Sequence, residues 1–175
     1  LTDTLNYLQS LGINAIELMP ASEFEGNLSW GYNPNFFFAA DKYYGTKNKF
    51  KAFIDSCHGR GIAVIMDVVL NHCMGSCPFA QLYWNSALNQ PAANNPWLNQ
   101  TATHDFNVGN DFNHDSPDTR YFVDRFTEYW LQNYNIDGYR FDLAKGFTQT
   151  YSVGNIGLWG QYDASRVYNL SLIHI

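Results

Sequence analysis

The sequence predicts an α/β fold built on a parallel sheet, and a segment of a barrel rather than a nucleotide-binding sheet. Helical and strand patterns alternate three times along the 175 residues, and such alternation produces parallel strands joined by right-handed crossovers. The run 62–70 is apolar on both faces except for Asp67, which is typical of a strand covered by helices on both sides. No GxGxxG or Walker-type phosphate-binding loop follows a predicted strand, which favours the barrel over the doubly wound sheet.

The first helix and strand are expected within residues 1–20. Four leucines recur at helical spacing: Leu1, Leu5, Leu8 and Leu11. Gly12 follows as a C-cap, and residues 13–20 are expected to form a short buried strand.

The second helix is expected after an aromatic, glycine-rich loop at residues 26–45. Within this loop, Phe36, Phe37 and Phe38 are expected to belong to the core. The buried face of this helix is predicted by apolar side chains at positions i, i+3, i+4 and i+7: Phe50, Phe53, Ile54 and Cys57. Gly59 and Gly61 mark its end, and strand 62–70 follows.

The third helix and strand are separated from the second pair by residues 71–116. This stretch is longer than ordinary loops and is expected to be a functional excursion or a small subdomain. Ser116 and Pro117 then predict the N-cap and first position of a helix that runs to about Tyr134. Strand 136–143 completes the alternation.

Composition and charge limit the classes of partner. Hydrophobic residues make up 46% of the chain and charged residues 15%, as in soluble globular proteins. A net charge of -6 without a Lys/Arg cluster argues against nucleic acid and anionic membrane surfaces, and no apolar run is long enough for a membrane span. Cys73 and Cys77 are close enough in sequence for a local disulfide, the alternative being structurally inert reduced thiols.

Polar side chains are concentrated at the predicted carboxyl ends of the strands, where α/β folds bind ligands. Arg140 and Asp142 share one face of their strand, and a guanidinium keeps a neighbouring carboxylate ionised. Asp142 is therefore either a reactive carboxylate or half of a structural ion pair.

Two further strand ends favour the reactive carboxylate. Asp67 and Asn71 lie on one face of their strand with His72 at the mouth of the next loop, and a buried aspartate needs a polar partner. Trp30 and Tyr32 provide aromatic faces that pack on sugar rings, whereas Asn, Asp and His bind sugar hydroxyls. Each feature alone also fits ordinary packing or capping. Their combination predicts a carbohydrate cleft.

Four segments, in this order, resemble motifs of the α-amylase superfamily of retaining glycoside hydrolases. They are 30-WGYNP-34 with 41-DKYYGT-46, 67-DVVLNH-72, 111-DFNHDSP-117 and 138-GYRFDLAK-145. The resemblance implies part of a TIM (β/α)8 barrel, about strands 2 to 4, with a short irregular subdomain inserted after strand 3. The implied division is a barrel segment at 1–72, the inserted subdomain at 73–117, and a barrel segment with helix 3, strand 4 and the start of helix 4 at 118–175. The last segment is expected to be truncated.

The resemblance also implies roles for individual residues. Asp142 resembles the nucleophile, and Arg140 resembles the guanidinium that positions and ionises it. Tyr32 resembles the platform under the sugar at the cleavage site, and Lys145 resembles a residue on the leaving-group side. The full set expected to bind substrate is Tyr32, Asp67, His72, Lys145 and Trp30.

The implied function is hydrolysis of α-1,4-glucosidic bonds in starch or maltooligosaccharides through an aspartyl glycosyl-enzyme intermediate. This chemistry also needs a protonated carboxylic acid about 5–5.5 Å from the nucleophile. In the family that acid ends the next barrel strand, so the chain alone is expected to be inactive. The alternatives are a non-catalytic sugar-binding or scaffold protein of the same fold, and a related transglycosylase or branching enzyme. The full-length protein is expected to be secreted or at the cell surface.

A calcium ion is the one cofactor that the resemblance implies. Asn71 and Asp111 resemble calcium-site positions in the inserted subdomain. Many family members place a histidine, whose carbonyl binds the ion, where this chain has Gly146. Because a backbone carbonyl needs no particular side chain, the glycine weakens the expectation of calcium without removing it.

Overall fold

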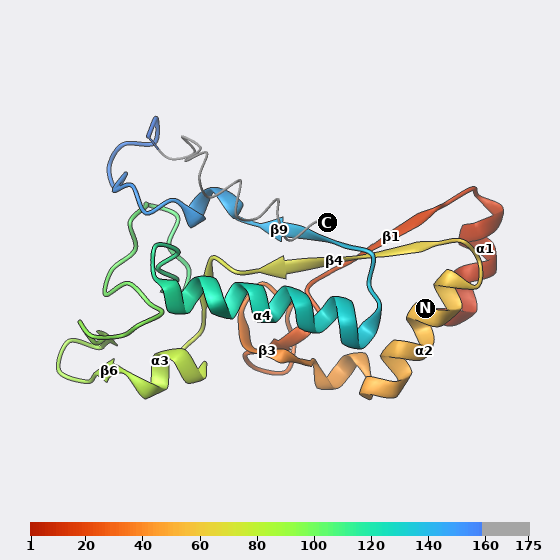
Figure 1. Ribbon diagram of the computed structural model, residues 1–175, viewed down its shortest axis with the longest axis horizontal. Coiled ribbons are helices and arrows are strands. Elements are labelled where there is room, and N and C mark those ends of the chain that lie inside the picture. The colour runs from red at the N-terminus through yellow and green to blue at the C-terminus, as the bar shows by residue number, and fades with distance from the viewer. Residues whose placement is uncertain (159–175) are drawn as a thin grey trace.

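A three-stranded parallel sheet forms the centre of the protein. The computed structural model describes residues 1–158, so the expected start of a helix and the tail within 159–175 lie outside the described residues. The strand order is β1–β4–β9, with bounds Ala15–Leu18, Ala63–Val69 and Gly138–Asp142. All three strands point towards the side where residues 71–116 gather (Figure 1). The predicted α/β fold with a parallel sheet is confirmed.

The central strand β4 sets the register of the sheet. Val64, Met66 and Val68 are buried on one face of β4. Asp67 points to the other face and lies opposite Arg140 of β9. β1 is different, because it lies at the edge of the described sheet and buries only Leu18. The expectation of a buried strand at 13–20 is therefore wrong for most of its residues.

The first helical segment is short. A 3-10 turn, η1 (Thr2–Thr4), leads into α1 (Leu5–Ser10), and Gly12 follows with a φ of 78°, as expected for a C-cap glycine. Leu5 is fully buried, but Leu1 and Leu11 are exposed. The predicted leucine stripe therefore contributes Leu5 to the core, and Leu8 packs against the core while partly buried, but Leu1 and Leu11 do not belong to it.

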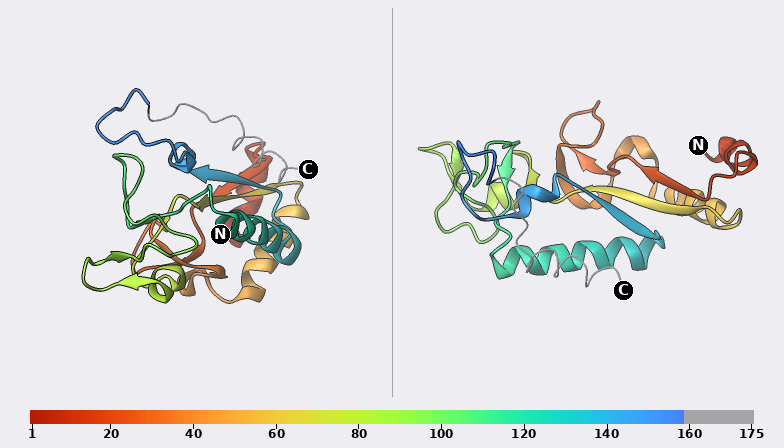
Figure 2. Two further views of the ribbon diagram at one scale, coloured as in Figure 1. Left: turned by 60° about the vertical axis from the view of Figure 1, so that its left-hand side comes forward. Right: turned by 90° about the horizontal axis from the view of Figure 1, so that it is seen from above.

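Helices α2 (Lys47–His58) and α4 (Pro117–Tyr134) contact each other and lie on the same side of the sheet (Figure 2). Both begin at side-chain caps, since Thr46 accepts a hydrogen bond from Lys49 N–H and Ser116 accepts one from Asp118 N–H. The predicted buried stripe of α2 is confirmed, and α4 buries Trp130, whose indole N–H donates to the Phe37 carbonyl at 3.0 Å.

An antiparallel hairpin replaces part of the expected loop at 26–45. It consists of β2 (Ser22–Phe24) and β3 (Pro34–Ala40), and the 3-10 turn η2 (Lys42–Tyr44) follows. Side chains alternate along a strand, so Phe37 is buried while Phe36 and Phe38 are 46% and 41% exposed. The assignment to the core is therefore confirmed for Phe37 and wrong for Phe36 and Phe38.

Residues 71–116 contain short elements that return the chain to the end of β4. Their bounds are β5 (His72–Cys73), α3 (Pro78–Leu82), β6 (Trp84–Asn85), β7 (Gln90–Pro91) and β8 (Asn110–Asp111). β5 pairs antiparallel with β8, and Phe112 packs against Phe37, Phe79 and Phe122. This aromatic cluster joins the excursion to the main core.

The three cysteines are free and buried. No helix within residues 1–158 meets the length and apolarity of a membrane span.

Candidate active site

Four side chains at the carboxyl end of the sheet form one connected network. Arg140 Nη1 donates to both carboxylate oxygens of Asp67 at 3.0 Å and to Asp142 Oδ1 at 2.5 Å. The Tyr32 hydroxyl donates to Asp67 Oδ2 at 2.8 Å. The register of β4 and β9 places Asp67 beside Arg140, and the two-residue period of β9 places Asp142 on the same face as Arg140.

The two carboxylates of this network differ in accessibility. The side chain of Asp67 is 3% exposed, whereas that of Asp142 is 24% exposed and that of Arg140 is 44% exposed. Hydrogen bonds to Asp67 and Asp142 raise the pKa of Arg140 above its ordinary value, so the guanidinium stays charged. Asp67 therefore anchors Arg140 from the interior, and Asp142 is the carboxylate that a ligand can reach.

The backbone turns sharply directly after Asp142. Leu143 has left-handed dihedrals, with φ 49° and ψ 36°, and the 3-10 turn η3 (Ala144–Phe147) follows. A leucine in this region is an outlier, and such strain is concentrated at functional sites. No signal in the sequence could have identified it, because leucine has no preference for left-handed backbone.

Tyr32 is held by both its side chain and its backbone. The hydrogen bond to Asp67 raises the pKa of the Tyr32 hydroxyl to about 12, so it remains a donor at neutral pH. Gly31 has a φ of 92°, and a Cβ there would lie 2.2 Å from the Pro20 carbonyl oxygen. The glycine of the WGYNP segment is thus needed for the loop to pass close to Pro20 and present Tyr32 to the network.

His72 is buried behind Tyr32. Its Nε2 lies 2.9 Å from the Tyr32 carbonyl oxygen and its Nδ1 lies 3.2 Å from Asn71 Nδ2. This arrangement requires the neutral tautomer in which Nε2–H donates to the carbonyl and Nδ1 accepts from the amide. Burial lowers the pKa of His72, which favours the same neutral state.

The lowered pKa of His72 predicts a pH-dependent stability. The unfolded chain takes up a proton near pH 6.5 more readily than the folded chain does, so stability should fall as pH drops below about 6.5. The fall should end below the folded-state pKa, where both states are protonated. Urea unfolding of the full-length protein between pH 5 and 7.5 should show this slope, and His72→Gln should reduce it. An equal slope in the variant would contradict the assignment.

Trp30 and Lys145 are both exposed. Trp30 is 77% exposed, and no hydrogen bond or ring contact with the network is found for it in residues 1–158. Lys145 is exposed within η3, three residues after Asp142.

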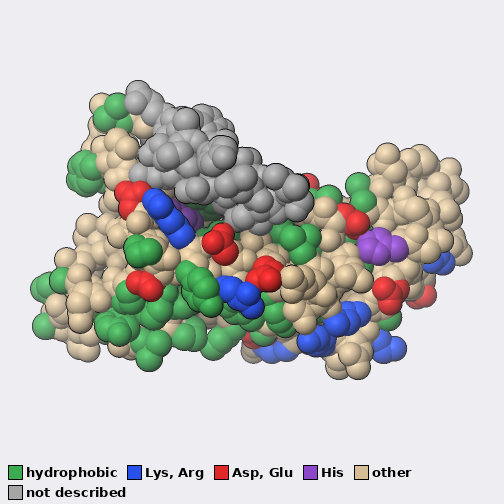
Figure 3. All heavy atoms as spheres, in the orientation of Figure 1, with side chains coloured by type: hydrophobic (Ala, Val, Ile, Leu, Met, Phe, Trp, Pro, Cys, Tyr) green, Lys and Arg blue, Asp and Glu red, His purple; other side chains and the backbone are tan. Residues whose placement is uncertain are grey.

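Figure 3 shows acidic and basic side chains interspersed across the face that carries β9 and α4, without a large patch of one sign on the visible described surface.

The two expected calcium ligands lie near His104, which the sequence did not indicate. Asn71 Oδ1 and Asp111 Oδ1 are buried without a hydrogen-bond partner in the described residues, which would suit a cation. However, His104 Nε2 lies 3.3 Å from Asp111 Oδ1, and residues 1–158 hold no group of three or more His, Cys, Asp or Glu side chains placed for a metal. Calcium takes six to eight oxygen ligands, amide and backbone carbonyl oxygens among them, so Asn71 Oδ1 and Asp111 Oδ1 would supply two of them and calcium binding stays a prediction.

Gly146 closes this buried cluster. A Cβ at this position would lie 1.8 Å from Asn71 Oδ1 and 2.9 Å from His104 Nε2. We expect Gly146→Ala to displace the Asn71 amide and to cost about 1–3 kcal/mol of stability. Gly75→Ala is the matched control, because a Cβ there meets no atom within 4 Å. Denaturant unfolding that shows equal stability for the two variants would contradict the packing of this cluster.

The sequence is similar to α-amylase-type proteins along most of its length. The family described as the α-amylase catalytic domain matches residues 1–87. A malto-oligosyltrehalose trehalohydrolase of Saccharolobus solfataricus is 33% identical over 80% of this chain and 23% of that protein. Isoamylase SU1 of Zea mays is 35% identical over 83% of this chain and 21% of its own length. The chain thus spans about a fifth to a quarter of these curated relatives.

Solved structures show the same relationship. Pullulanase type I of Bacillus subtilis, complexed with maltose, superposes with a TM-score of 0.66 at 30% identity, over 81% of this chain and 22% of that one. Amy13B of Eubacterium rectale superposes with a TM-score of 0.73 over 98% of this chain and 35% of that one, at 24% identity, which shows the fold alone. The parallel sheet with its helices is accordingly part of a TIM barrel. The chain belongs to the α-amylase family and comprises part of its catalytic domain.

Proposed function

We propose that the full-length protein is a retaining glycoside hydrolase that cleaves α-1,4-glucosidic bonds, with Asp142 as its nucleophile. The observation that carries the proposal is the arrangement Asp67–Arg140–Asp142, in which a guanidinium anchored by a buried carboxylate holds a second, accessible carboxylate. The guanidinium orients the accessible carboxylate through a charge-assisted hydrogen bond, and a positioned carboxylate is what attack on a sugar requires. The relatives include a pullulanase of Bacillus subtilis and isoamylase SU1 of Zea mays, which supports a glucan as the substrate.

In the proposed reaction, an Asp142 oxygen attacks the anomeric carbon while the glycosidic oxygen leaves with a proton from a carboxylic acid. The resulting glycosyl-enzyme ester is then hydrolysed by water, and the anomeric configuration is retained. We propose that the acid comes from the barrel strand after β9, so that residues 1–175 alone do not turn over. By the same proposal β1, β4 and β9 are barrel strands 2 to 4, and residues 73–117 are the subdomain inserted after strand 3.

The remaining predicted residues receive supporting roles. The hydroxyl of Tyr32 is tied to Asp67, which fixes the phenol ring as a platform for the sugar. His72 uses both ring nitrogens within the protein, so we assign it the positioning of the Tyr32 segment rather than direct sugar binding. Exposed Trp30 and Lys145 would contact glucan units on either side of the cleaved bond. We further propose a secreted or cell-surface location for the protein.

The stereochemistry of the first product tests this proposal. Proton NMR of the full-length protein acting on maltopentaose should show the α-anomer accumulating before mutarotation, because a nucleophilic carboxylate causes a double displacement. The control reaction contains the Asp142→Asn variant, which should form no product. Accumulation of the β-anomer would exclude Asp142 as a covalent nucleophile.

A glucan-branching transferase is the second candidate. It is favoured by the 33% identity to the 1,4-α-glucan branching enzyme GlgB of Aliivibrio fischeri, over 87% of this chain. A transferase uses the same covalent intermediate but passes the glycosyl group to a sugar hydroxyl. Incubation with amylose separates the two, since hydrolysis raises the number of reducing ends and branching leaves that number constant while it adds α-1,6 linkages.

A further inference from the structure

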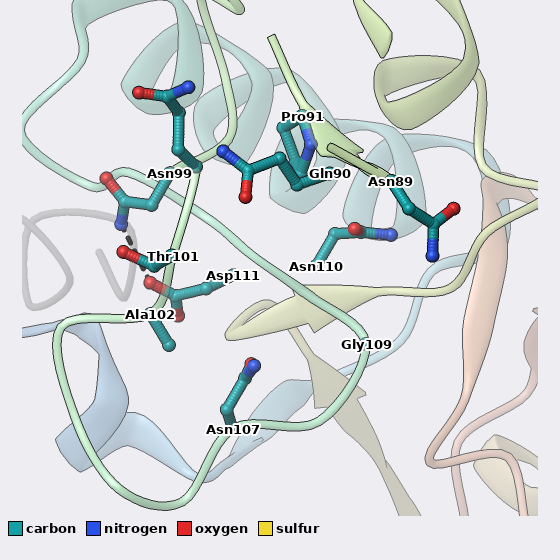
Figure 4. A pocket seen from close by; sticks show the side chains of 11 residues that line it. Asn89, Gln90, Pro91, Asn99, Thr101, Ala102, Asn107, Gly109, Asn110 and Asp111 are labelled. Carbon is teal, nitrogen blue, oxygen red and sulfur yellow. Dashed lines mark hydrogen bonds between the residues drawn. The ribbon is translucent and has the colours of Figure 1, made fainter. Parts of the chain in front are cut away.

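A polar cavity of about 210 Å³ lies within residues 89–111, beside β7 and β8 (Figure 4). None of the residues assigned above to catalysis or substrate binding lines it. Its walls carry side-chain carboxamides from three separate stretches of the loop: Asn89, Gln90, Asn99, Gln100, Asn107 and Asn110. We call this cavity the amide pocket.

Part of the amide pocket is fixed and part is available to a ligand. Asn99 Nδ2 donates to Asp111 Oδ2 at 2.7 Å and to Gln149 Oε1 at 2.8 Å, which holds the inner wall. Asn89, Gln90 and Asn107 make no side-chain hydrogen bond to other residues of the described part of the chain. The outer wall therefore offers amide donors and acceptors that no described protein group uses.

The backbone around the amide pocket is constrained. Asn89 and Gly109 both have left-handed backbone, with φ values of 50° and 57°. A Cβ at residue 109 would lie 2.5 Å from the Cys73 carbonyl oxygen, so β8 passes close to β5 there only because the residue is glycine. The pocket is thus attached to the strand pair that begins at His72, next to the candidate active site.

The chemistry of the walls favours a neutral ligand. The one ionisable lining residue is Asp111, which is 2% exposed and already contacts Asn99 and His104. A carboxamide both donates and accepts, as a sugar hydroxyl does, whereas Pro91 and Ala102 add apolar surface suited to the C–H face of a sugar ring. The cavity is smaller than the roughly 300–1,000 Å³ of sites that enclose a drug-sized ligand, which suits a single sugar unit.

We propose that the amide pocket is a second, non-catalytic binding site for a glucose unit of an α-glucan chain. The choice of glucan among sugars rests on the proposed function, whereas the choice of a neutral polyhydroxyl ligand rests on the pocket itself. A chain held there would be retained beside the active site, and long glucans would gain affinity from engaging both sites. Short oligosaccharides that reach only the active site would gain none.

Affinity electrophoresis in gels containing soluble starch tests the proposal. The full-length protein carries Asp142→Asn, so that the starch stays intact. We expect Gln90→Ala/Asn107→Ala to weaken retardation by starch roughly tenfold, as two lost hydrogen bonds to the ligand imply. Asn48→Ala, which removes an exposed amide on α2, is the control and should leave retardation unchanged. Ala102→Trp, which fills the cavity, should act like the double variant, and thermal melts confirm that each variant is folded.

Two results would overturn the proposal. One is equal retardation of the double variant, of Ala102→Trp and of the control. The other is a parallel loss of activity on a short chromogenic maltotrioside when the pocket variants are made in the enzyme with Asp142 intact, because the pocket would then belong to the catalytic cleft. If no glycosidase activity is found but the pocket variants still lose starch retardation, the proposed function fails while the binding site stands.

Discussion

Replacement of Asp142 by asparagine is expected to lower turnover of maltooligosaccharides by at least about a thousandfold, because the amide cannot form the covalent ester. Asparagine has the shape of aspartate and its oxygen can still accept from Arg140, so the network and the fold should persist. The measurement is kcat of the purified full-length protein on maltopentaose. Asp115→Asn, at an exposed surface carboxylate, is the control and should keep full activity. Turnover of Asp142→Asn within tenfold of the unaltered protein would refute the nucleophile assignment.

Removal of the guanidinium is expected to damage stability as well as activity. Arg140→Met would leave the buried carboxylate of Asp67 with the hydrogen bond from Tyr32 as its one remaining side-chain partner within residues 1–158. Loss of one partner from a buried pair costs about 3–5 kcal/mol, and we expect the lower end because Arg140 is itself half-exposed. The free energy of unfolding from urea titration of the full-length protein measures this effect.

Two comparisons make the Arg140 result specific. Arg125→Met removes an exposed ion pair with Glu128 on α4 and should cost no more than about 1 kcal/mol. Asp67→Leu combined with Arg140→Met removes both buried charges and should recover most of the lost stability while activity stays absent. A cost for Arg140→Met that equals the cost for Arg125→Met would show that Arg140 does not hold the buried carboxylate.

The sequence predicts best the elements whose local signals agree with their surroundings. Helix α4 begins directly after the predicted cap Ser116, and α2 buries the predicted stripe from Phe50 to Cys57, because local pattern and packing agree in both helices. The pair of Arg140 and Asp142 likewise follows from the two-residue period of a strand, whereas the contact of Asp67 with Arg140 depends on the register of β4 and β9. Spacing therefore predicts the helices and the Arg140–Asp142 pair, but not the partners that Asp67 finds in Arg140 and Tyr32.

Other features depend on contacts that spacing does not reveal. The hairpin β2–β3 has no two-residue Asn-Gly or Asp-Gly turn to mark it, and three consecutive phenylalanines hide which of them points inward. The approach of His104 to Asp111, and of Gly146 to Asn71, arises from tertiary packing of the excursion against the strand ends. The left-handed Leu143 is likewise imposed by its surroundings rather than by its type.

Trapping of the covalent intermediate tests the central claim most directly. The full-length protein is incubated with a 5-fluoro-α-glycosyl fluoride, which forms the glycosyl-enzyme faster than water hydrolyses it, and the digest is analysed by tandem mass spectrometry. The account predicts one added glycosyl group on the peptide that contains Asp142, and none when Asp142→Asn is treated in the same way. A glycosyl group on Asp67, or on any carboxylate other than Asp142, would contradict it.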